Sequence, residues 1–373
     1  MLFFCNAFIS ALARNQWHKL HYSVRNFLIQ KELTLADIRP FHGTHYNQSL
    51  IKDMAKVICP PYDIIPPQLQ QELHERSEYN FIRIEYGLES PHDSNTDNKY
   101  TRAAAAMDNW LKKNILIKDE KPCIYIDEHT FIHQGKTKKR RSISAIVKLE
   151  QWDRKIIRPH EGTLAKAKSD RLSLLWALSA NTSPIMALYE DKQDTIGTTL
   201  SKQLKKKPLY NVGKTDGESH RFWAVSDEET INKVRDCLKD KPLYIADGHH
   251  RYESALNYQR ERRSASGLEN KELPYDFVMM TLIDMDDPGL VILPAHRMGS
   301  GLPPSAIDAL ASRLETFFII EEETISETKL RAQINRLLGD SQTDSNLVLC
   351  GLKKDKLLSL SLRDAESVKS MFP

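Results

Sequence analysis

The chain has 373 residues, of which 40% are hydrophobic and 28% charged, a composition typical of a globular protein with more than one domain. Lys and Arg number 53 and Asp and Glu 50, for a net charge of +3, which disfavours a nucleic-acid coat protein. Only 14 glycines and 17 prolines occur, without a repeat, and this excludes collagen-like and other fibrous classes.

Five cysteines lie far apart and form no Cys-x-x-Cys pair, so we expect neither a disulfide framework nor a zinc knuckle. Reduced thiols, together with the lack of an apolar stretch of ~20 residues, indicate a cytoplasmic protein without a membrane span. Residues 1–34 include a basic stretch without Asp or Glu up to residue 31, and we interpret them as an N-terminal extension outside the fold.

Hydrophobic periodicity predicts helices and strands that alternate along the chain. We expect helices over residues 68–77, 100–113, 170–180, 194–206, 228–238, 252–263, 304–314 and 325–338. We expect strands over residues 81–86, 123–132, 142–149, 184–189, 220–225, 243–246, 277–283, 290–293, 317–321, 346–352 and 357–362.

The predicted elements do not follow a regular βαβ order, so the fold class that they indicate is α+β (mixed α/β), with mixed sheets and flanking helices. Two α/β regions are expected, residues 35–210 and 211–373, which meet near the polar stretch 207–219. The basic run 135–141 lies between two predicted strands. We interpret it as a solvated hairpin turn rather than as a nucleic-acid patch.

The sharpest local feature is Asp247-Gly248-His249-His250-Arg251, at the junction of a predicted strand and a predicted helix. Gly248 allows a sharp turn of the backbone. The free N–H groups at a helix start, with Arg251 and the histidines, suit phosphate oxygens. Asp247 can hold Mg²⁺ or accept a proton. The alternative is an Asp N-cap beside two surface histidines, and we favour the functional interpretation.

A second segment, Arg-Pro-His-Glu-Gly-Thr at 158–163, follows a predicted strand end. Glu161 could serve as a base toward a substrate hydroxyl. Lys166, Lys168 and Arg171 follow it and could neutralise phosphate charge. A polar loop with solvated lysines explains the same residues equally well.

The third segment, Cys-Pro-Pro-Tyr-Asp at 59–63, holds Tyr62 and Asp63 in a stiff stretch of backbone. It suits either a small polar ligand or a purely structural turn. Asn181 and His296 lie in weaker motifs at predicted strand ends. The sequence contains no P-loop, Gly-x-Gly-x-x-Gly, His-Glu-x-x-His or Gly-x-Ser-x-Gly motif, which disfavours the enzyme classes built on them.

Together these segments resemble the bacterial and archaeal family catalogued as domain of unknown function 1015. The motifs that carry the resemblance stand in family order at residues 39–41, 59–65, 158–163, 168–171, 181–185, 247–251 and 294–297. The Asp-Gly-His-x-Arg block is similar to the phosphate-binding turn of the ParB/sulfiredoxin-like fold. The resemblance therefore implies a ParB/sulfiredoxin-like core.

That superfamily includes kinases that phosphorylate free L-serine. Members of the family accompany serine-biosynthesis genes. The resemblance thus implies a phosphotransferase that acts on free L-serine, gives O-phosphoserine, and uses Mg²⁺ with ATP, ADP or pyrophosphate as the phosphoryl donor.

On this interpretation each motif has a role. The expected catalytic residues are Asp247, Glu161 and His249, and Asp247 also holds the metal. The expected phosphate-binding residues are Gly248, His250, Arg251, Lys166, Lys168 and Arg171. The expected amino-acid-binding residues are Tyr62, Asp63, His160, Asn181 and Arg39.

Two alternatives stay open. A metal-dependent phosphoserine phosphatase would use zinc or manganese on His249, His250 and His296. A nucleotide- or nucleic-acid-binding module would follow the analogy with ParB, although the nearly neutral net charge disfavours nucleic acid. We therefore expect a small-molecule substrate and a phosphoryl donor as partners, with no membrane, and the sequence leaves the oligomeric state open.

Overall fold

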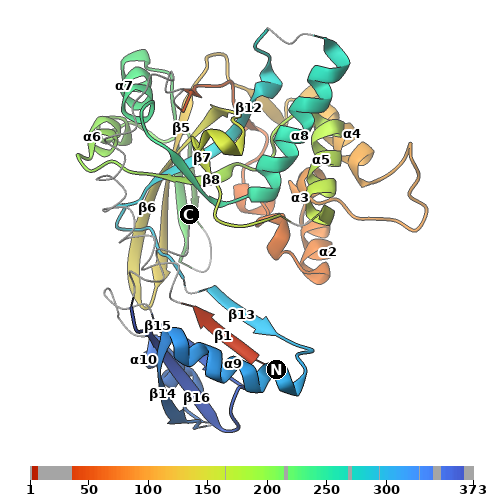
Figure 1. Ribbon diagram of the computed structural model, residues 1–373. Coiled ribbons are helices and arrows are strands. Elements are labelled where there is room, and N and C mark those ends of the chain that lie inside the picture. Colours follow the sequence, from red (N-terminus) through yellow and green to blue (C-terminus); the bar gives the residue numbers. More distant parts are fainter. Residues whose placement is uncertain are drawn as a thin grey trace. The chain divides into compact units, whose positions relative to one another are not determined.

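The computed structural model of the protein describes residues 2–6, 36–163, 165–213, 217–267, 271–293, 295–326, 328–338 and 346–364. The chain divides into two compact units (Figure 1). Unit 1 comprises residues 1–32 and 291–373, and unit 2 comprises residues 33–290. The predicted boundary between residues 210 and 211 falls inside strand β9 of unit 2, where sheet hydrogen bonds to β10 continue without a break.

Unit 2 is built on a nine-stranded mixed sheet in the order β7–β11–β8–β12–β6–β5–β10–β9, with β2 paired to β6. Its strands are β2 (Ile38–Arg39), β5 (Ile124–His133), β6 (Lys136–Lys148), β7 (Ile157–Arg158), β8 (Ile185–Tyr189), β9 (Tyr210–Gly213), β10 (Ser219–Val225), β11 (Leu243–Asp247) and β12 (Phe277–Asp284). The β7–β11 and β8–β12 pairs are parallel, and the other pairs are antiparallel. Strands β3 (Thr44–Tyr46) and β4 (Leu116–Lys118) form a separate two-stranded sheet.

Helices cover both sides of these strands. They are α2 (Pro67–Arg76), α3 (Ile82–Glu85), α4 (Lys99–Lys112), α5 (Ala165–Leu178), α6 (Thr195–Ser201), α7 (Glu228–Leu238) and α8 (His249–Ser266). Figure 1 shows α6 and α7 on one side and α2 to α5 with α8 on the other. Helix α7 buries Ile231, Val234 and Leu238, whose spacing places them on one helical face toward the sheet.

Helix α8 is fixed to the sheet and to α5 by buried contacts. The hydroxyl of Tyr252, a fully buried side chain, donates to the carbonyl oxygen of Glu150 at 2.8 Å and accepts the Glu150 N–H at 2.9 Å. Ser254 Oγ donates to the carbonyl oxygen of Lys168 on α5 at 3.0 Å. Because buried polar groups are costly unless they are paired, these bonds define where the N-terminal part of α8 lies.

Unit 1 contains a five-stranded sheet in the order β13–β1–β15–β16–β14. Its elements are β1 (Leu2–Asn6), β13 (Ala295–Gly299), α9 (Pro304–Phe317), β14 (Phe318–Thr324), α10 (Leu330–Leu338), β15 (Asn346–Cys350) and β16 (Lys356–Leu362). Residues 2–6 thus belong to a sheet, whereas residues 1–34 were expected outside the fold. Their apolar composition suits a strand, and residues 7–35 lie outside the described part of the chain.

The α+β class with mixed sheets and flanking helices is confirmed, whereas a ParB-like core stays a prediction. Three local predictions differ from the structure. Residues 81–86 contain the helix α3 instead of a strand, residues 290–293 precede β13 without forming a strand, and the basic run belongs to β6 from Lys136 onward. The hairpin turn itself is Gln134-Gly135, both with positive φ.

No helix among the described residues is long and apolar enough to cross a membrane.

Candidate functional site

Three segments meet at one edge of the nine-stranded sheet in unit 2. Strands β7 and β11 are parallel neighbours, so the residues that follow both of them emerge at the same edge. Strand β8 runs antiparallel to β11, so the residues that precede it start there as well. The sheet therefore brings residues 159–163, 181–184 and the start of α8 together, as the separate sequence motifs suggested.

Gly248 forms the junction of β11 and α8. Its φ is +93°, a conformation that is strained for residues with a Cβ. A Cβ at this position would also lie 2.9 Å from Nε of Arg251. The guanidinium of Arg251 folds back over the glycine, where it pairs with the carboxylate of Asp247 and donates to the carbonyl oxygen of Pro184. Gly248 therefore permits the fold-back of Arg251.

His249 lies in the first turn of α8 and is only 1% exposed. Its Nε2 accepts the backbone N–H of His160 at 3.2 Å, and the two rings are T-shaped at 4.5 Å between centroids. The neutral imidazole then carries its proton on Nδ1, which lies 3.3 Å from Oε1 of Glu161. Burial, followed by the neighbouring His160, lowers the pKa of His249.

The remaining polar residues of this edge are tied to α8 through Glu253. Its carboxylate accepts the Thr163 hydroxyl at 2.5 Å and the Lys168 ammonium at 2.8 Å. Burial alone would raise the pKa of Glu253, but the bonds from Lys168 and Thr163 outweigh it and the pKa is lowered. Lys168 is thus already ion-paired.

Arg171 on α5 is buried, with 6% exposure, among acidic partners. Its Nε and Nη2 donate to Asp170, and its Nη1 and Nη2 donate to the carbonyl oxygen and the carboxylate of Glu85. These five bonds use all five donors of a guanidinium. The Tyr62 ring covers the guanidinium at 4.0 Å. Arg171 therefore fixes Glu85 in place within this network.

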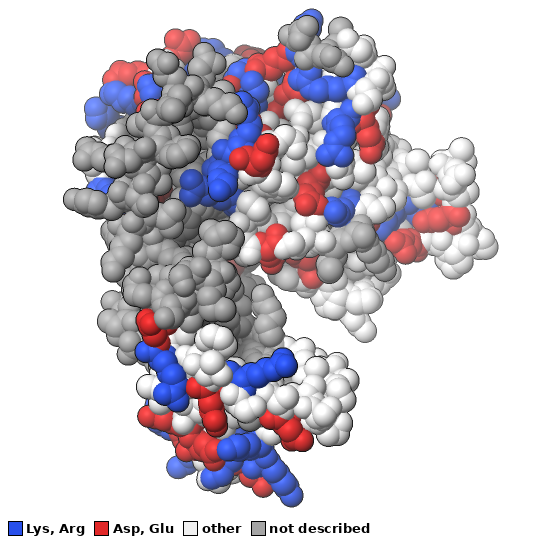
Figure 2. Space-filling view, viewed as in Figure 1, with Lys and Arg blue, Asp and Glu red and all other residues white. Residues whose placement is uncertain are grey.

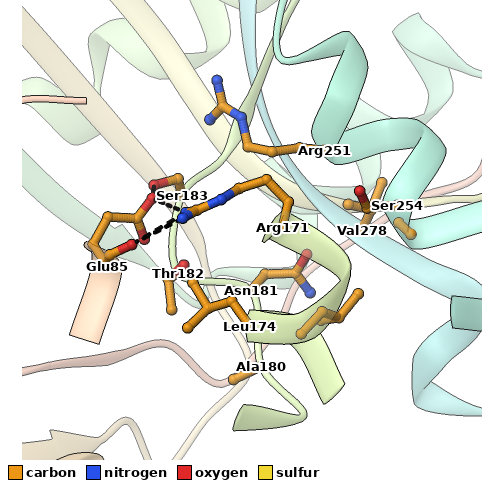
Figure 3. Close-up of a pocket in the computed structure, with 12 residues that line it drawn as sticks. Glu85, Arg171, Leu174, Ala180, Asn181, Thr182, Ser183, Arg251, Ser254 and Val278 are labelled. Carbon is orange, nitrogen blue, oxygen red and sulfur yellow. Dashed lines mark hydrogen bonds and ion pairs between the residues drawn. The ribbon is translucent and has the colours of Figure 1, made fainter. Parts of the chain in front are cut away.

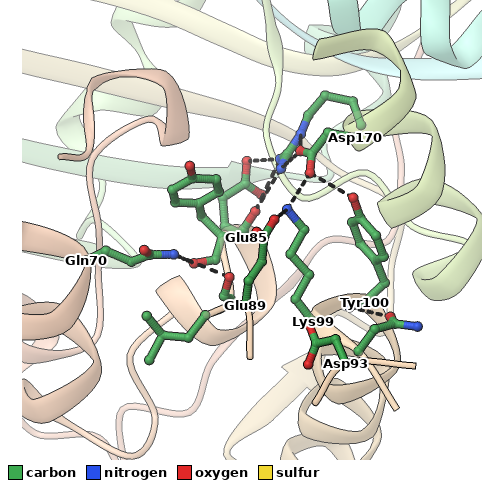
Figure 4. Close-up of polar contacts among 12 residues, drawn as sticks. Gln70, Glu85, Glu89, Asp93, Lys99, Tyr100 and Asp170 are labelled. Carbon is green, nitrogen blue, oxygen red and sulfur yellow. Dashed lines mark hydrogen bonds and ion pairs between the residues drawn. The ribbon is translucent and has the colours of Figure 1, made fainter. Parts of the chain in front are cut away.

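The same network extends to α4 (Figure 4). Asp170 also accepts the Tyr100 hydroxyl at 2.8 Å and pairs with the Lys99 ammonium at 2.7 Å. Burial disfavours the charged form of Asp170, but Arg171 and Lys99 outweigh this and lower its pKa. Charges of both signs are thereby balanced inside unit 2, which limits the cost of burying them.

A small cavity of about 40 Å³ is lined by Arg251 of α8 together with Arg171 and Glu85. Figure 3 shows the side chains that line it, among them Arg251, Arg171 and Glu85. Asn181, Thr182, Ser183 and Ser254 contribute polar lining, beside Leu174, Leu175, Ala180, Ala255 and Val278.

Glu85 is the residue of this cavity with an unmet bonding capacity. Its side chain is 3% exposed, and its Oε1 accepts Arg171 at 3.1 Å and the Ser183 hydroxyl at 2.6 Å. Its Oε2 is buried and has no hydrogen-bond partner. A buried carboxylate oxygen without a donor is costly in free energy, which points to a ligand donor at this atom.

Sequence reasoning missed Glu85, because it treated residues 81–86 as a strand with no polar role. It also passed over Thr182, Ser183 and Glu253. The Asn-Thr-Ser-Pro motif was a usable signal for the first two, whereas only the three-dimensional pairing reveals Glu253.

The other predicted site residues lie in varied places. Asp63 is exposed on a 3-10 helix beside Tyr62. Arg39 pairs with Asp37 and Glu272 and stacks on Phe277 at 4.5 Å. His250 is partly buried in the first turn of α8. The side chains of Lys166 and His296 lie outside the described part of the structure.

The carboxylate of Asp247 is the group at this site that suits Mg²⁺. The Asp247 side chain is 55% exposed, and Mg²⁺ in phosphoryl-transfer sites is commonly held by one or two carboxylates together with substrate phosphates. The zinc site of the phosphatase alternative fits less well, because the His160 N–H already occupies Nε2 of His249.

Comparison with known proteins supplies a family and no further relative. No curated protein and no solved structure matches the chain, so the ParB/sulfiredoxin-like resemblance rests on the sequence motif alone. The family model described as "Protein of unknown function (DUF1015)" matches residues 38–370. The match covers nearly the whole chain, and the protein therefore belongs to the DUF1015 family.

Proposed function

We propose that the protein is a phosphotransferase that transfers a phosphoryl group to free L-serine and yields O-phosphoserine. The observation that carries this proposal is the buried Oε2 of Glu85, a residue that lines a small cavity, because this oxygen has no hydrogen-bond donor. An ammonium group is a suitable donor for such a carboxylate oxygen. The cavity has room for only a few water-sized groups, which favours the head group of a small amino acid.

The start of α8 suits the phosphoryl donor. Backbone N–H groups of its first turn and Arg251 offer positive potential and donors to phosphate oxygens. Mg²⁺ held by Asp247 would neutralise charge that develops on the transferring group. Arg251 could exchange its bonds to Asp247 and Pro184 for a phosphate oxygen.

Glu161 or Asp247 would accept the proton of the serine hydroxyl as its oxygen bonds to phosphorus and the bond to the donor's leaving group breaks. The neutral His249 orients this region, since its Nδ1 lies 3.3 Å from Oε1 of Glu161 and its Nε2 accepts the backbone N–H of His160. On the face of unit 2 visible in Figure 2, acidic and basic side chains are interspersed, which suits a small substrate better than a nucleic acid.

The test is phosphorus NMR of the purified full chain with Mg²⁺ and L-serine, in separate tubes with ATP, ADP or pyrophosphate. New O-phosphoserine in any tube supports the proposal and names the donor. A tube with O-phosphoserine alone serves as the control for the reverse chemistry. Release of phosphate in that tube alone would reassign the protein as a phosphoserine phosphatase, and no turnover in any tube would refute the proposal.

A further inference from the structure

A second polar cluster in unit 2 lies on neighbouring strands and involves none of the residues discussed above. His129 on β5 and His220 on β10 are directly opposite in the antiparallel register, and Glu218 precedes β10. The two imidazole rings are stacked, with 4.1 Å between centroids and 8° between planes. Nε2 of His129 lies 3.6 Å from Oε2 of Glu218.

One ligand atom from each of His129, Glu218 and His220 can be chosen so that all three lie within 4.8 Å of one another. In a tetrahedral zinc site, with bonds of ~2.0–2.2 Å, neighbouring ligand atoms are separated by about 3.3 Å. The His129–Glu218 pair is already close to that value. A tilt of the imidazole rings out of their parallel stack, with a shift of at most about 1.5 Å at the widest pair, would complete the set.

Two further features prepare these histidines for a metal. His220 Nδ1 lies 3.0 Å from Oδ1 of Asp127, and metal-bound histidines commonly donate their other ring N–H to a carboxylate in this way. Nε2 of His129 is buried and has no hydrogen-bond partner.

One contact opposes the arrangement weakly. Arg140 Nη2 lies 3.5 Å from Nδ1 of His129, at the outer limit of a hydrogen bond. When Nε2 binds a metal, Nδ1 keeps the ring proton, so the guanidinium of Arg140 must turn away. Its side chain is partly exposed, which leaves room for this movement.

We propose that His129, His220 and Glu218 bind one zinc ion, with water in the fourth position. Two imidazoles and one carboxylate favour zinc and similar transition metals over Mg²⁺ and Ca²⁺. The ion would connect β5 to the start of β10. This site is separate from the proposed phosphotransfer site and does not depend on it.

The test uses the full chain without a polyhistidine tag, stripped with a chelator and then titrated with zinc chloride. Calorimetry and elemental analysis after gel filtration should give one zinc per chain. Glu218→Gln and the His129→Gln/His220→Gln pair should abolish retention, and Asp127→Asn should weaken binding about 10- to 100-fold. His133→Gln, on the same strand, is the matched control and should bind like the wild type.

Circular dichroism of each variant shows whether the fold is kept. Glu218 lies outside the strands and is about one-third exposed, so we expect Glu218→Gln to fold. This variant therefore tests the proposal even if the double histidine variant does not fold. The proposal is overturned if the wild-type chain retains no zinc after gel filtration. It is equally overturned if folded Glu218→Gln retains as much zinc as the wild type.

Discussion

Replacement of Glu85 by Gln tests the cavity most directly. Gln keeps an oxygen that can accept from Arg171 and Ser183. The bond from Arg171 stays charge-assisted through the guanidinium, so only the Ser183 bond becomes one between neutral groups. Bonds to charged groups contribute about 1.5–3 kcal/mol and neutral ones about 1 kcal/mol. Asp170 continues to pair with Arg171 at 2.6 Å. We therefore expect the free energy of unfolding to fall by about 0.5–2 kcal/mol, or about 1–8 °C in Tm.

The effect on substrate binding should be larger than the effect on stability. If Oε2 of Glu85 accepts the ammonium group of serine, its loss removes a charge-assisted bond of about 1.5–3 kcal/mol. This corresponds to a rise in KM of about 10- to 100-fold, with a smaller change in kcat because the reacting hydroxyl lies elsewhere. Steady-state kinetics with serine as the varied substrate measures both constants.

Glu89→Gln is the matched control for this experiment. Glu89 belongs to the same network through Lys99, at 2.8 Å, but its side chain is 75% exposed. Exposed ion pairs contribute little to stability, so Tm and KM should stay near their wild-type values. An unchanged KM in folded Glu85→Gln would refute the assignment of Oε2 to the ammonium group. A large fall in kcat with unchanged KM would instead make Glu85 the base for the hydroxyl.

Three further predictions concern the start of α8. If Asp247 acts as proposed, Asp247→Asn should reduce turnover severely. The circular dichroism spectrum should stay unchanged, because in the described part of the chain the exposed carboxylate pairs only with Arg251. Gly248→Ala should lower Tm by about 2–8 °C through left-handed strain of ~1–2 kcal/mol, and calorimetry measures this. The pKa of His249 is lowered in the folded protein, so the unfolded chain takes up a proton at this histidine at a higher pH than the folded chain does. As pH falls from ~6.5 to the folded-state pKa, this difference lowers the free energy of unfolding. Between pH 7.5 and 5.5, the Tm of His249→Gln should therefore fall by less than the Tm of the wild type.

Elements with strong local signals could be predicted from the sequence. Helix α7 has the predicted bounds, because Asp227 caps its start by accepting the Thr230 N–H at 2.9 Å and its apolar residues follow helical spacing. The β11–α8 junction was also recognised, although α8 begins at His249 rather than near Tyr252. In both cases the deciding interactions lie within a few residues of the sequence.

Helix α3 shows why other parts could not be predicted. Ile82, Ile84 and Tyr86 fit strand alternation. The buried Asn80 overrides this pattern, because its Oδ1 accepts the Ile82 N–H at 3.0 Å while its Nδ2 donates to the carbonyl oxygens of residues 56 and 58. These long-range bonds are absent from any local pattern, and they place Glu85 in the cavity.

The two arginines of the cavity differ in what they can offer a ligand. All five N–H groups of Arg171 donate to Glu85 and Asp170. A phosphate could therefore bind Arg171 only if this buried, charge-balanced network were broken. Arg251 makes its bonds to one partly exposed carboxylate and one carbonyl oxygen. Exchange of these partners for a phosphate costs less, because Asp247 can be hydrated or take up Mg²⁺ when it is released. The Asp247–Arg251 pair is therefore the part of the site that can change partners during the proposed phosphoryl transfer, while Arg171 keeps Glu85 fixed.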